Sequence, residues 1–145
     1  MTRVRSTMAA LTLALSTAPC FADAGRVLDD WNLIGTWAPD CSKPASPGNA
    51  LATYAQRGDR AFLERDIGRH QDQFPIIDAT TRPDGTLAIV IDFGRAGKRT
   101  NVFVKDSEDR IRAITNHDSK GRHSVRNGVV LALKRPTPWQ QRCAP

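Results

Sequence analysis

The sequence predicts an all-β fold, an antiparallel up-and-down barrel of about eight short strands preceded by a short helical turn. Runs of alternating apolar and polar residues recur along the chain, and turn signals rich in Gly, Pro and Asp separate them. Such spacing is typical of a β-sandwich or a barrel. One cysteine near each end of the strand-rich region favours the barrel, because a bridge between them makes the first and last strands neighbours.

Residues 1–24 are predicted to be a signal peptide. Arg3 and Arg5 precede an apolar run that is too short to span a bilayer. Ala22-Asp23-Ala24 has the form of a cleavage site, so we expect cleavage near Ala24. The mature chain is then a single domain at 25–145, periplasmic or secreted, with no transmembrane segment.

Cys41 and Cys143 are the two cysteines expected in the mature chain. An oxidising compartment favours a disulfide between them, which requires their Cα atoms to lie within about 7 Å. The loop that it closes, about a hundred residues long, makes the bridge worth roughly 4–5 kcal/mol on the chain-entropy model. Two free thiols or an intermolecular bond are the alternatives, and we favour the intramolecular bridge.

The predicted elements follow in chain order. Val27, Leu28 and Trp31 stand at helical spacing and predict one or two helical turns. The Pro-, Ser- and Gly-rich residues 41–49 predict a loop. Asn127-Gly128 is the preferred pair for a tight hairpin turn. Strand-like runs occupy 50–56, 60–67, 74–81, 86–93, 99–106, 110–117 and 124–135.

The alternation also predicts which side chains face the barrel interior. Val102 and Val104 are expected inside and Phe103 outside. Most of the inward residues are bulky, so we expect a mostly filled barrel with a shallow pocket at one mouth. The other predicted inward positions are Leu87, Ile89, Ile91, Phe93, Ile111, Leu131 and Leu133.

Gly35-Thr36-Trp37, which follows the predicted helical turn, resembles the Gly-x-Trp motif that opens the first strand of lipocalins and related calycins. The resemblance implies that Trp37 packs across one barrel end against an arginine near the last strand, here Arg135 or Arg142. It also implies binding of a small hydrophobic or vitamin-like ligand, or of a partner protein. The second lipocalin motif, Thr-Asp-Tyr, is absent.

The chain is also similar to small exported bacterial proteins of unknown function that carry Gly-Thr-Trp, then a cysteine, and a second cysteine near the C-terminus. This resemblance supports the architecture and implies no activity.

The sequence shows no catalytic constellation, since no nucleophile–base pair stands out, and we do not expect an enzyme or a cofactor. We predict no metal site, because no two of His70, His117 and His123 have the sequence spacing that is typical of metal ligands. A metal or acid–base site at His117, Asp118 and His123 is the alternative. Nucleic acid is not an expected partner, because the predicted strands lack an aromatic stacking platform.

The function predicted first is an exported, non-enzymatic binding module of unknown ligand. Its ligand is expected to be a small molecule at the barrel mouth, lined by Trp31, Trp37 or Tyr54. The alternative is a periplasmic protein-interaction or enzyme-inhibitor protein that acts through a basic loop at 120–126.

Six basic residues in and beside two predicted turns indicate a second candidate binding surface, which we call the basic rim. In a meander the turns alternate between the barrel ends, so two basic turns separated by one turn lie at the same end. Such a rim attracts anionic surfaces or an acidic envelope protein. Cationic loops that only keep the domain soluble are the alternative. The basic rim consists of Arg95, Lys98, Arg99, Lys120, Arg122 and Arg126.

Overall fold

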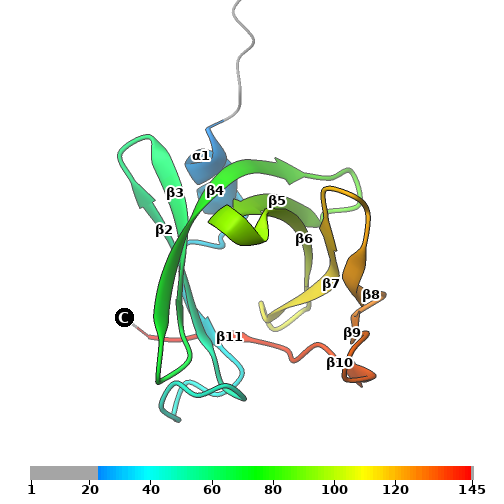
Figure 1. Cartoon of the computed structure of the whole chain (residues 1–145). Coiled ribbons are helices and arrows are strands. Elements are labelled where there is room, and N and C mark those ends of the chain that lie inside the picture. Colours follow the sequence, from blue (N-terminus) through cyan, green and yellow to red (C-terminus); the bar gives the residue numbers. More distant parts are fainter. Residues whose placement is uncertain (1–22, 145) are drawn as a thin grey trace, which may run out of the picture.

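The computed structural model describes residues 23–144, so all but the last two residues of the predicted signal peptide lie outside the described residues. Helix α1 (Ala24–Asp30) comes first, and a short 3-10 turn, η1 (Gly94–Ala96), lies between two later strands (Figure 1). No helix in this part of the chain has the length and apolarity that a membrane span requires. The strands are β1 (Gly35–Ala38), β2 (Leu51–Arg57), β3 (Arg60–Asp66), β4 (Gln71–Thr81), β5 (Leu87–Asp92), β6 (Lys98–Lys105), β7 (Ile111–Asp118), β8 (His123–Arg126), β9 (Val129–Val130), β10 (Arg135–Pro136) and β11 (Gln141–Arg142).

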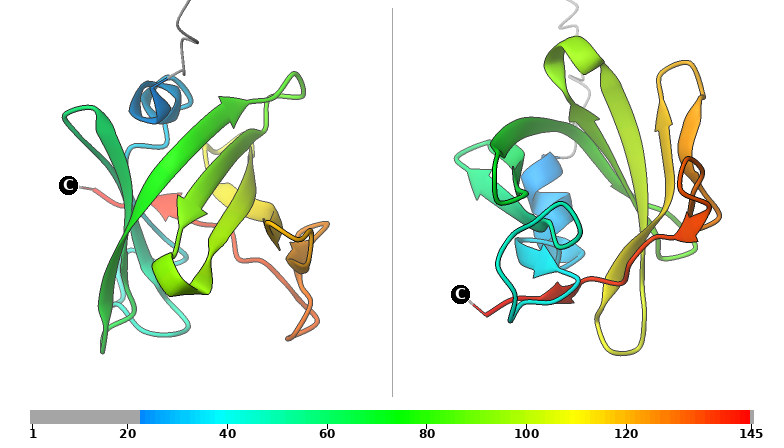
Figure 2. Two further views of the ribbon diagram at one scale, coloured as in Figure 1. Left: turned by 45° about the horizontal axis from the view of Figure 1, so that its top comes forward. Right: turned by 60° about the horizontal axis from the view of Figure 1, so that its bottom comes forward.

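All eleven strands belong to one antiparallel sheet, in the order β10-β9-β8-β7-β6-β5-β4-β3-β2-β1-β11. Each strand from β1 to β9 pairs with the next strand in the chain, which confirms the predicted all-β, up-and-down fold with one short helix. The predicted number of about eight strands is too low, because runs as short as β9, β10 and β11 show no alternation that a sequence pattern can reveal. The sheet is strongly curled (Figure 2).

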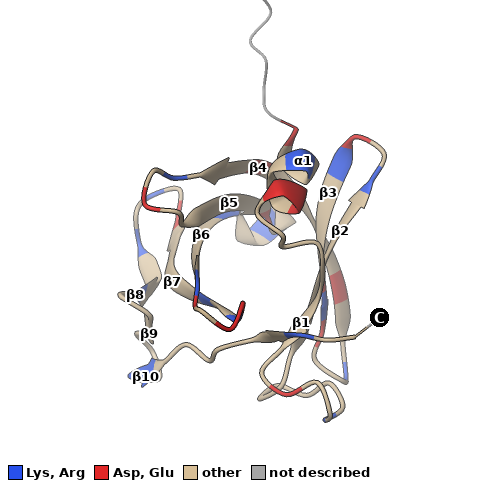
Figure 3. Cartoon of the chain, turned by 180° about the vertical axis from the view of Figure 1, so that it is seen from behind, with Lys and Arg blue, Asp and Glu red and all other residues tan. Residues whose placement is uncertain are grey.

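The C-terminal segment, residues 137–144, bridges the two sides of the curled sheet. Gln140 exchanges two backbone hydrogen bonds of 2.8 and 2.9 Å with Ile111 at the start of β7. The next two residues form β11, which pairs antiparallel with β1. The segment therefore reaches from β7 to β1, along the lower side of the ring of strands in Figure 3.

The predicted disulfide between Cys41 and Cys143 is confirmed. Their Cα atoms lie 5.4 Å apart, although 102 residues separate them in the chain. Beside the bridge, the backbone N–H of Cys143 donates to the Thr36 carbonyl oxygen at 2.8 Å. The bridge and this hydrogen bond attach the end of the chain to the first strand.

Helix α1 packs against β2, β3 and β4 and covers one end of the curled sheet. The Asp23 carboxylate caps the helix by accepting a hydrogen bond of 3.0 Å from the Gly25 N–H. Leu28 is fully buried, and the chain then turns into the core at Leu33. The larger members of the core are Leu28, Trp31, Leu33, Trp37, Tyr54, Leu63, Ile76, Leu87, Ile89, Ile91, Phe103 and Ile111.

The alternation predicted for β5 is confirmed, because Leu87, Ile89 and Ile91 are fully buried and the residues between them are not. For β6 the predicted faces, with Val102 and Val104 inside and Phe103 outside, are wrong. Phe103 lies directly opposite Leu87 in the neighbouring strand, so it shares the core face. Val102 is buried on the opposite face, and a β-bulge after it shifts the pairing with β7.

The predicted inward positions Leu131 and Leu133 are also wrong, since these side chains are 43% and 66% exposed. The hairpin at Asn127-Gly128 leads only into the two-residue strand β9, and residues 131–134 form the turn to β10. Phe93 is partly buried and packs on Phe74, with ring centres 4.6 Å apart.

The two ends of the sheet differ in what covers them. Successive turns of a meander alternate between the ends. Helix α1 lies at the end that carries the β2–β3, β4–β5 and β6–β7 turns, which we call the helix end. The opposite end, the loop end, carries loop 39–50 and the turns at 67–70, 93–97 and 119–122.

Removing the disulfide should destabilise the fold strongly. The double substitution Cys41→Ser with Cys143→Ser is expected to lower the free energy of unfolding by about 2–5 kcal/mol, because the unfolded chain regains the entropy of a long open loop. Urea unfolding followed by tryptophan fluorescence measures the change. Reductant should destabilise the wild type and leave the variant unaffected; equal midpoints for the two proteins without reductant would contradict this account.

Candidate functional site

The aromatic residues predicted to line a ligand site, Trp31, Trp37 and Tyr54, are buried in the core, with exposed fractions of 9%, 1% and 4%. The Trp31 indole N–H donates to a backbone carbonyl of the β4–β5 turn at 2.9 Å. The Lys105 ammonium lies 4.5 Å from the centre of the Trp31 ring. The Tyr54 ring meets Phe103 edge to face, and burial raises the pKa of the Tyr54 phenol. These contacts give the three aromatic side chains a structural role, whereas a ligand at the mouth remains a prediction.

Arg142, rather than Arg135, is the arginine that contacts Trp37. Its guanidinium carbon lies 4.5 Å from the centre of the Trp37 ring, a cation–π contact. The same guanidinium donates hydrogen bonds to the backbone carbonyls of Asn32 and Ile34 and to the Asn32 side chain, the last at 2.9 Å. Arg142 thereby joins the C-terminal segment to the link between α1 and β1.

Gly35 gives Arg142 the space that it needs. Its φ of 132° lies in a region that residues with a side chain rarely adopt. A Cβ atom at this position would lie 2.6 Å from Nη1 of Arg142. The glycine of the Gly-Thr-Trp sequence is therefore required by backbone conformation and by the close approach of the guanidinium.

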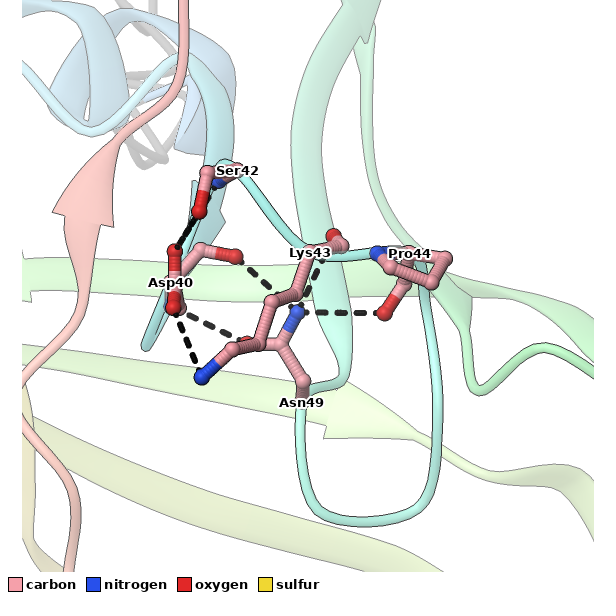
Figure 4. Close-up of polar contacts among 5 residues, drawn as sticks. All are labelled: Asp40, Ser42, Lys43, Pro44 and Asn49. Atoms are coloured by element: carbon pink, nitrogen blue, oxygen red, sulfur yellow. Dashed lines mark hydrogen bonds and ion pairs between the residues drawn. The ribbon is translucent and has the colours of Figure 1, made fainter.

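Loop 39–50 is ordered by Asn49, whose side chain is at the centre of the contacts in Figure 4. Its amide N–H groups donate to the carbonyls of Asp40, Lys43 and Pro44, at 3.0, 3.2 and 3.2 Å. Hydrogen bonds from the Ser42 hydroxyl at 2.6 Å and from Lys43 lower the pKa of Asp40 to about 2. The Asp40 carboxylate is committed to these local donors, and the loop presents no nucleophile–base pair.

The structure places the two basic turns of the rim side by side at the loop end. Arg99 at the start of β6 lies opposite Asp118 at the end of β7, so turns 93–97 and 119–122 are neighbours. Both turns lie on the upper side of the right-hand view in Figure 2. Arg126 lies apart from them at the other end of β8, where it pairs with Val129.

Two of the rim arginines hold the turns in place. Arg99 donates to Asn116 at 2.6 Å and to Ser124 at 2.9 Å. Arg122 forms an ion pair of 2.7 Å with Asp118, and hydrogen bonds from the Arg122 backbone and guanidinium lower the pKa of Asp118 to about 2. The remaining rim cations are exposed and form no ion pair within residues 23–144: Arg95, Lys98, Lys120 and Arg126.

A polar hollow of about 500 Å³ lies on the outer face of β1, β2, β3 and β4. The cross-strand neighbours Thr36, Thr53, Glu64 and Gln73 run across it, on the face opposite the core. The Thr36 and Thr53 hydroxyls share a hydrogen bond of 2.8 Å, and Arg57 forms an ion pair with Glu64. Hydroxyl, amide, carboxylate and guanidinium groups line the hollow, without a histidine or a cysteine.

His117 and His123 face each other across the hairpin of β7 and β8, with ring centres 5.3 Å apart. Asp118, which the sequence placed with them, is bound to Arg122 instead. His70 lies elsewhere and contacts an aspartate of β4. The register of the hairpin, which sequence spacing does not reveal, creates the histidine pair. Among the described residues, no group of three or more His, Cys, Asp or Glu side chains could hold a metal ion.

Comparison of the chain with protein-family models, with curated proteins and with solved structures found no match. The role of each residue is therefore inferred from its contacts, its burial and its charge.

Replacing Gly35 should weaken the attachment of Arg142. Gly35→Ala is expected to destabilise the fold by about 1–3 kcal/mol, because the new methyl group adds backbone strain and displaces the guanidinium. Gly48→Ala is the matched control, since a Cβ atom there meets nothing within 4 Å and the backbone is not left-handed. Thermal unfolding measures both variants, and a Gly35→Ala protein as stable as the Gly48→Ala protein would contradict the role of the glycine.

Proposed function

We propose that the protein is an exported, non-enzymatic binding module that recognises an acidic surface of a partner protein through the basic rim. One observation carries this proposal. Two neighbouring turns at the loop end hold Arg95, Lys98 and Lys120 exposed, with no ion pair among the described residues. Cations that protrude without a local counter-charge raise the rate and the specificity of association with an acidic partner.

The rim is preorganised for such a contact. Arg99 ties β6 to β7 and β8, and the Asp118 carboxylate accepts hydrogen bonds from the backbone N–H groups of Lys120 and Arg122, each at 2.9 Å. A surface that is already ordered loses less conformational entropy on binding. The exposed cations are spread over two turns and do not converge on one point, which favours a broad acidic protein surface over a single small anion.

The proposed architecture is a lipocalin-like barrel in an oxidising compartment. The contact of Trp37 with Arg142, next to Gly35, supports the likeness to calycins, whose members bind ligands or partner proteins. The disulfide supports export, because structural disulfides persist mainly outside the cytosol. A predicted signal peptide at 1–24 is consistent with the same location.

A small-molecule ligand is the second candidate, and the polar hollow on the outer face favours it. Its volume of about 500 Å³ falls within the range of ligand pockets. Its lining of hydroxyls, amides, carboxylates and guanidinium groups suits a polar ligand better than the apolar one that the lipocalin resemblance implies. The mouth site predicted at Trp31, Trp37 and Tyr54 is less favoured, because all three side chains are packed in the core.

Neutralising the rim tests the proposal directly. The double variant Lys98→Ala with Lys120→Ala is expected to bind a polyglutamate peptide about two- to thirtyfold more weakly than the wild type, because each exposed charge contact contributes about 0.2–1 kcal/mol. Fluorescence anisotropy of the labelled peptide at low salt measures the affinity. Added salt should weaken wild-type binding more than binding by the variant.

The charge-matched control is Arg60→Ala with Arg82→Ala, which removes two exposed cations from the helix end. This control should retain wild-type affinity. Equal weakening in both double variants would show that net charge alone drives the binding and would reject the rim. Saturable binding of a polar ligand in the outer hollow, with unchanged peptide binding in the rim variant, would favour the small-molecule function.

A further inference from the structure

We propose that His117 and His123 form a two-ligand binding site for a divalent transition-metal ion on the hairpin of β7 and β8. The proposal is independent of the function proposed for the rim. It rests on three observations: the register of the hairpin, the hydrogen bonds of the two imidazoles, and the separation of the rings.

The hairpin register places the two histidines directly opposite each other. A β-bulge lies beside the pair, where Asn116 pairs with Val125 and leaves Ser124 as the extra residue of β8. Directly opposite residues of an antiparallel pair have Cβ atoms about 4.5–5.5 Å apart, so their side chains lie together on one face. Both histidines are partly exposed, and an ion can therefore reach them from solvent.

The hydrogen bonds of the rings leave the same nitrogen free in both residues. Nδ1 of His117 lies 3.0 Å from the Asp118 carbonyl oxygen, and Nδ1 of His123 lies 3.3 Å from the Val125 carbonyl oxygen. A carbonyl oxygen only accepts, so each Nδ1 is the donor and carries the hydrogen. In a neutral imidazole Nε2 then holds a lone pair. Donation from one ring nitrogen to a backbone carbonyl is the arrangement by which proteins orient metal-binding histidines.

The separation of the rings suits a shared ion. Two imidazoles on one tetrahedral ion have ring centres roughly 5 Å apart, since the metal–nitrogen bond is about 2.0–2.1 Å and the ring centre lies about 1 Å beyond the nitrogen. The observed separation is 5.3 Å, and the rings are tilted by 52° instead of being stacked face to face. A small rotation of the side chains is enough to direct both Nε2 atoms at one point.

The ligand set indicates the class of metal. Imidazole nitrogens suit Cu²⁺, Ni²⁺ and Zn²⁺, and Cu²⁺ binds such ligands most tightly of the three. Water or a group from a partner fills the remaining coordination positions of the ion. The described residues contain no third His, Cys, Asp or Glu side chain that could bind the ion together with the two histidines. Of the charges in the adjoining turn, the Arg122 guanidinium is paired with Asp118, and the ammonium of Lys120 is exposed to solvent.

Copper titration of the full chain, expressed without a polyhistidine tag, tests the site. Isothermal titration calorimetry with Cu²⁺ in a weakly coordinating buffer should show saturable binding to one site per chain. His117→Ala and His123→Ala should each weaken that binding about tenfold or more. Even the loss of a residue that only hydrogen-bonds to a metal ligand typically lowers metal affinity about 10–100-fold. Electron paramagnetic resonance of the wild-type complex should show coupling to two imidazole nitrogens.

His70→Ala is the matched control, because His70 is exposed, lies on another hairpin and contacts Asp72. This control should keep wild-type affinity. A measurement on the wild type alone covers the case in which a variant misfolds: Cu²⁺ should protect His117 and His123, but not His70, from acylation by diethyl pyrocarbonate, read by mass spectrometry. Unchanged affinity in folded His117→Ala and His123→Ala proteins, or equal acylation of all three histidines with and without Cu²⁺, overturns the proposal.

Discussion

The attachment of the C-terminal segment to β1 is the constraint on which the rest of this structure depends. A curled antiparallel sheet leaves unpaired backbone groups along both of its sides, and these have to find partners. Here one short segment pairs with Trp37 and Ala38 of β1, and an isolated bridge at Gln140 connects it to Ile111 at the start of β7. The disulfide and the guanidinium of Arg142 then hold the segment in place.

The curl of the sheet also separates the two ends of the molecule. At the helix end, α1 and the link that follows it pack Leu28 and Leu33 into the core, and the turns there are close to the helix. At the loop end no α-helix within residues 23–144 covers the sheet, and polar networks order the loops instead. Asn49 organises loop 39–50, and Arg99 with Asp118 orders the basic turns. The features that suit contact with other molecules therefore lie mainly at the loop end, on loops held by a stable sheet.

Much of this arrangement follows from local patterns in the sequence. The alternation of Leu87, Ile89 and Ile91 predicts the core face of β5, and the position of the two cysteines predicts the bridge. The contact between Trp37 and an arginine near the last strand follows from the Gly-x-Trp resemblance, although the sequence left Arg135 and Arg142 as alternatives. These predictions succeed because each depends on one strand or on a pair of residues with a strong chemical preference.

The features that the sequence analysis missed depend on how neighbouring strands align. Phe103 faces the core because it lies opposite Leu87, and the alternation of β6 alone does not reveal which of its two faces is buried in the core. The pair of His117 and His123 depends on a bulge, at Ser124, so the spacing of the two residues in the chain does not reveal it. Single-residue shifts in register reverse the face of every later side chain, and sequence alternation alone does not locate them.

Amide hydrogen exchange measured by NMR tests the attachment of the C-terminal segment most directly. If the C-terminal segment is part of the cooperative fold, the amides of Ile111, Gln140 and Cys143 should exchange only through global unfolding, as slowly as the amides in the middle of β5. Exchange of the Gln140 and Cys143 amides at the rate of an unstructured chain end, while β5 remains protected, would contradict the account.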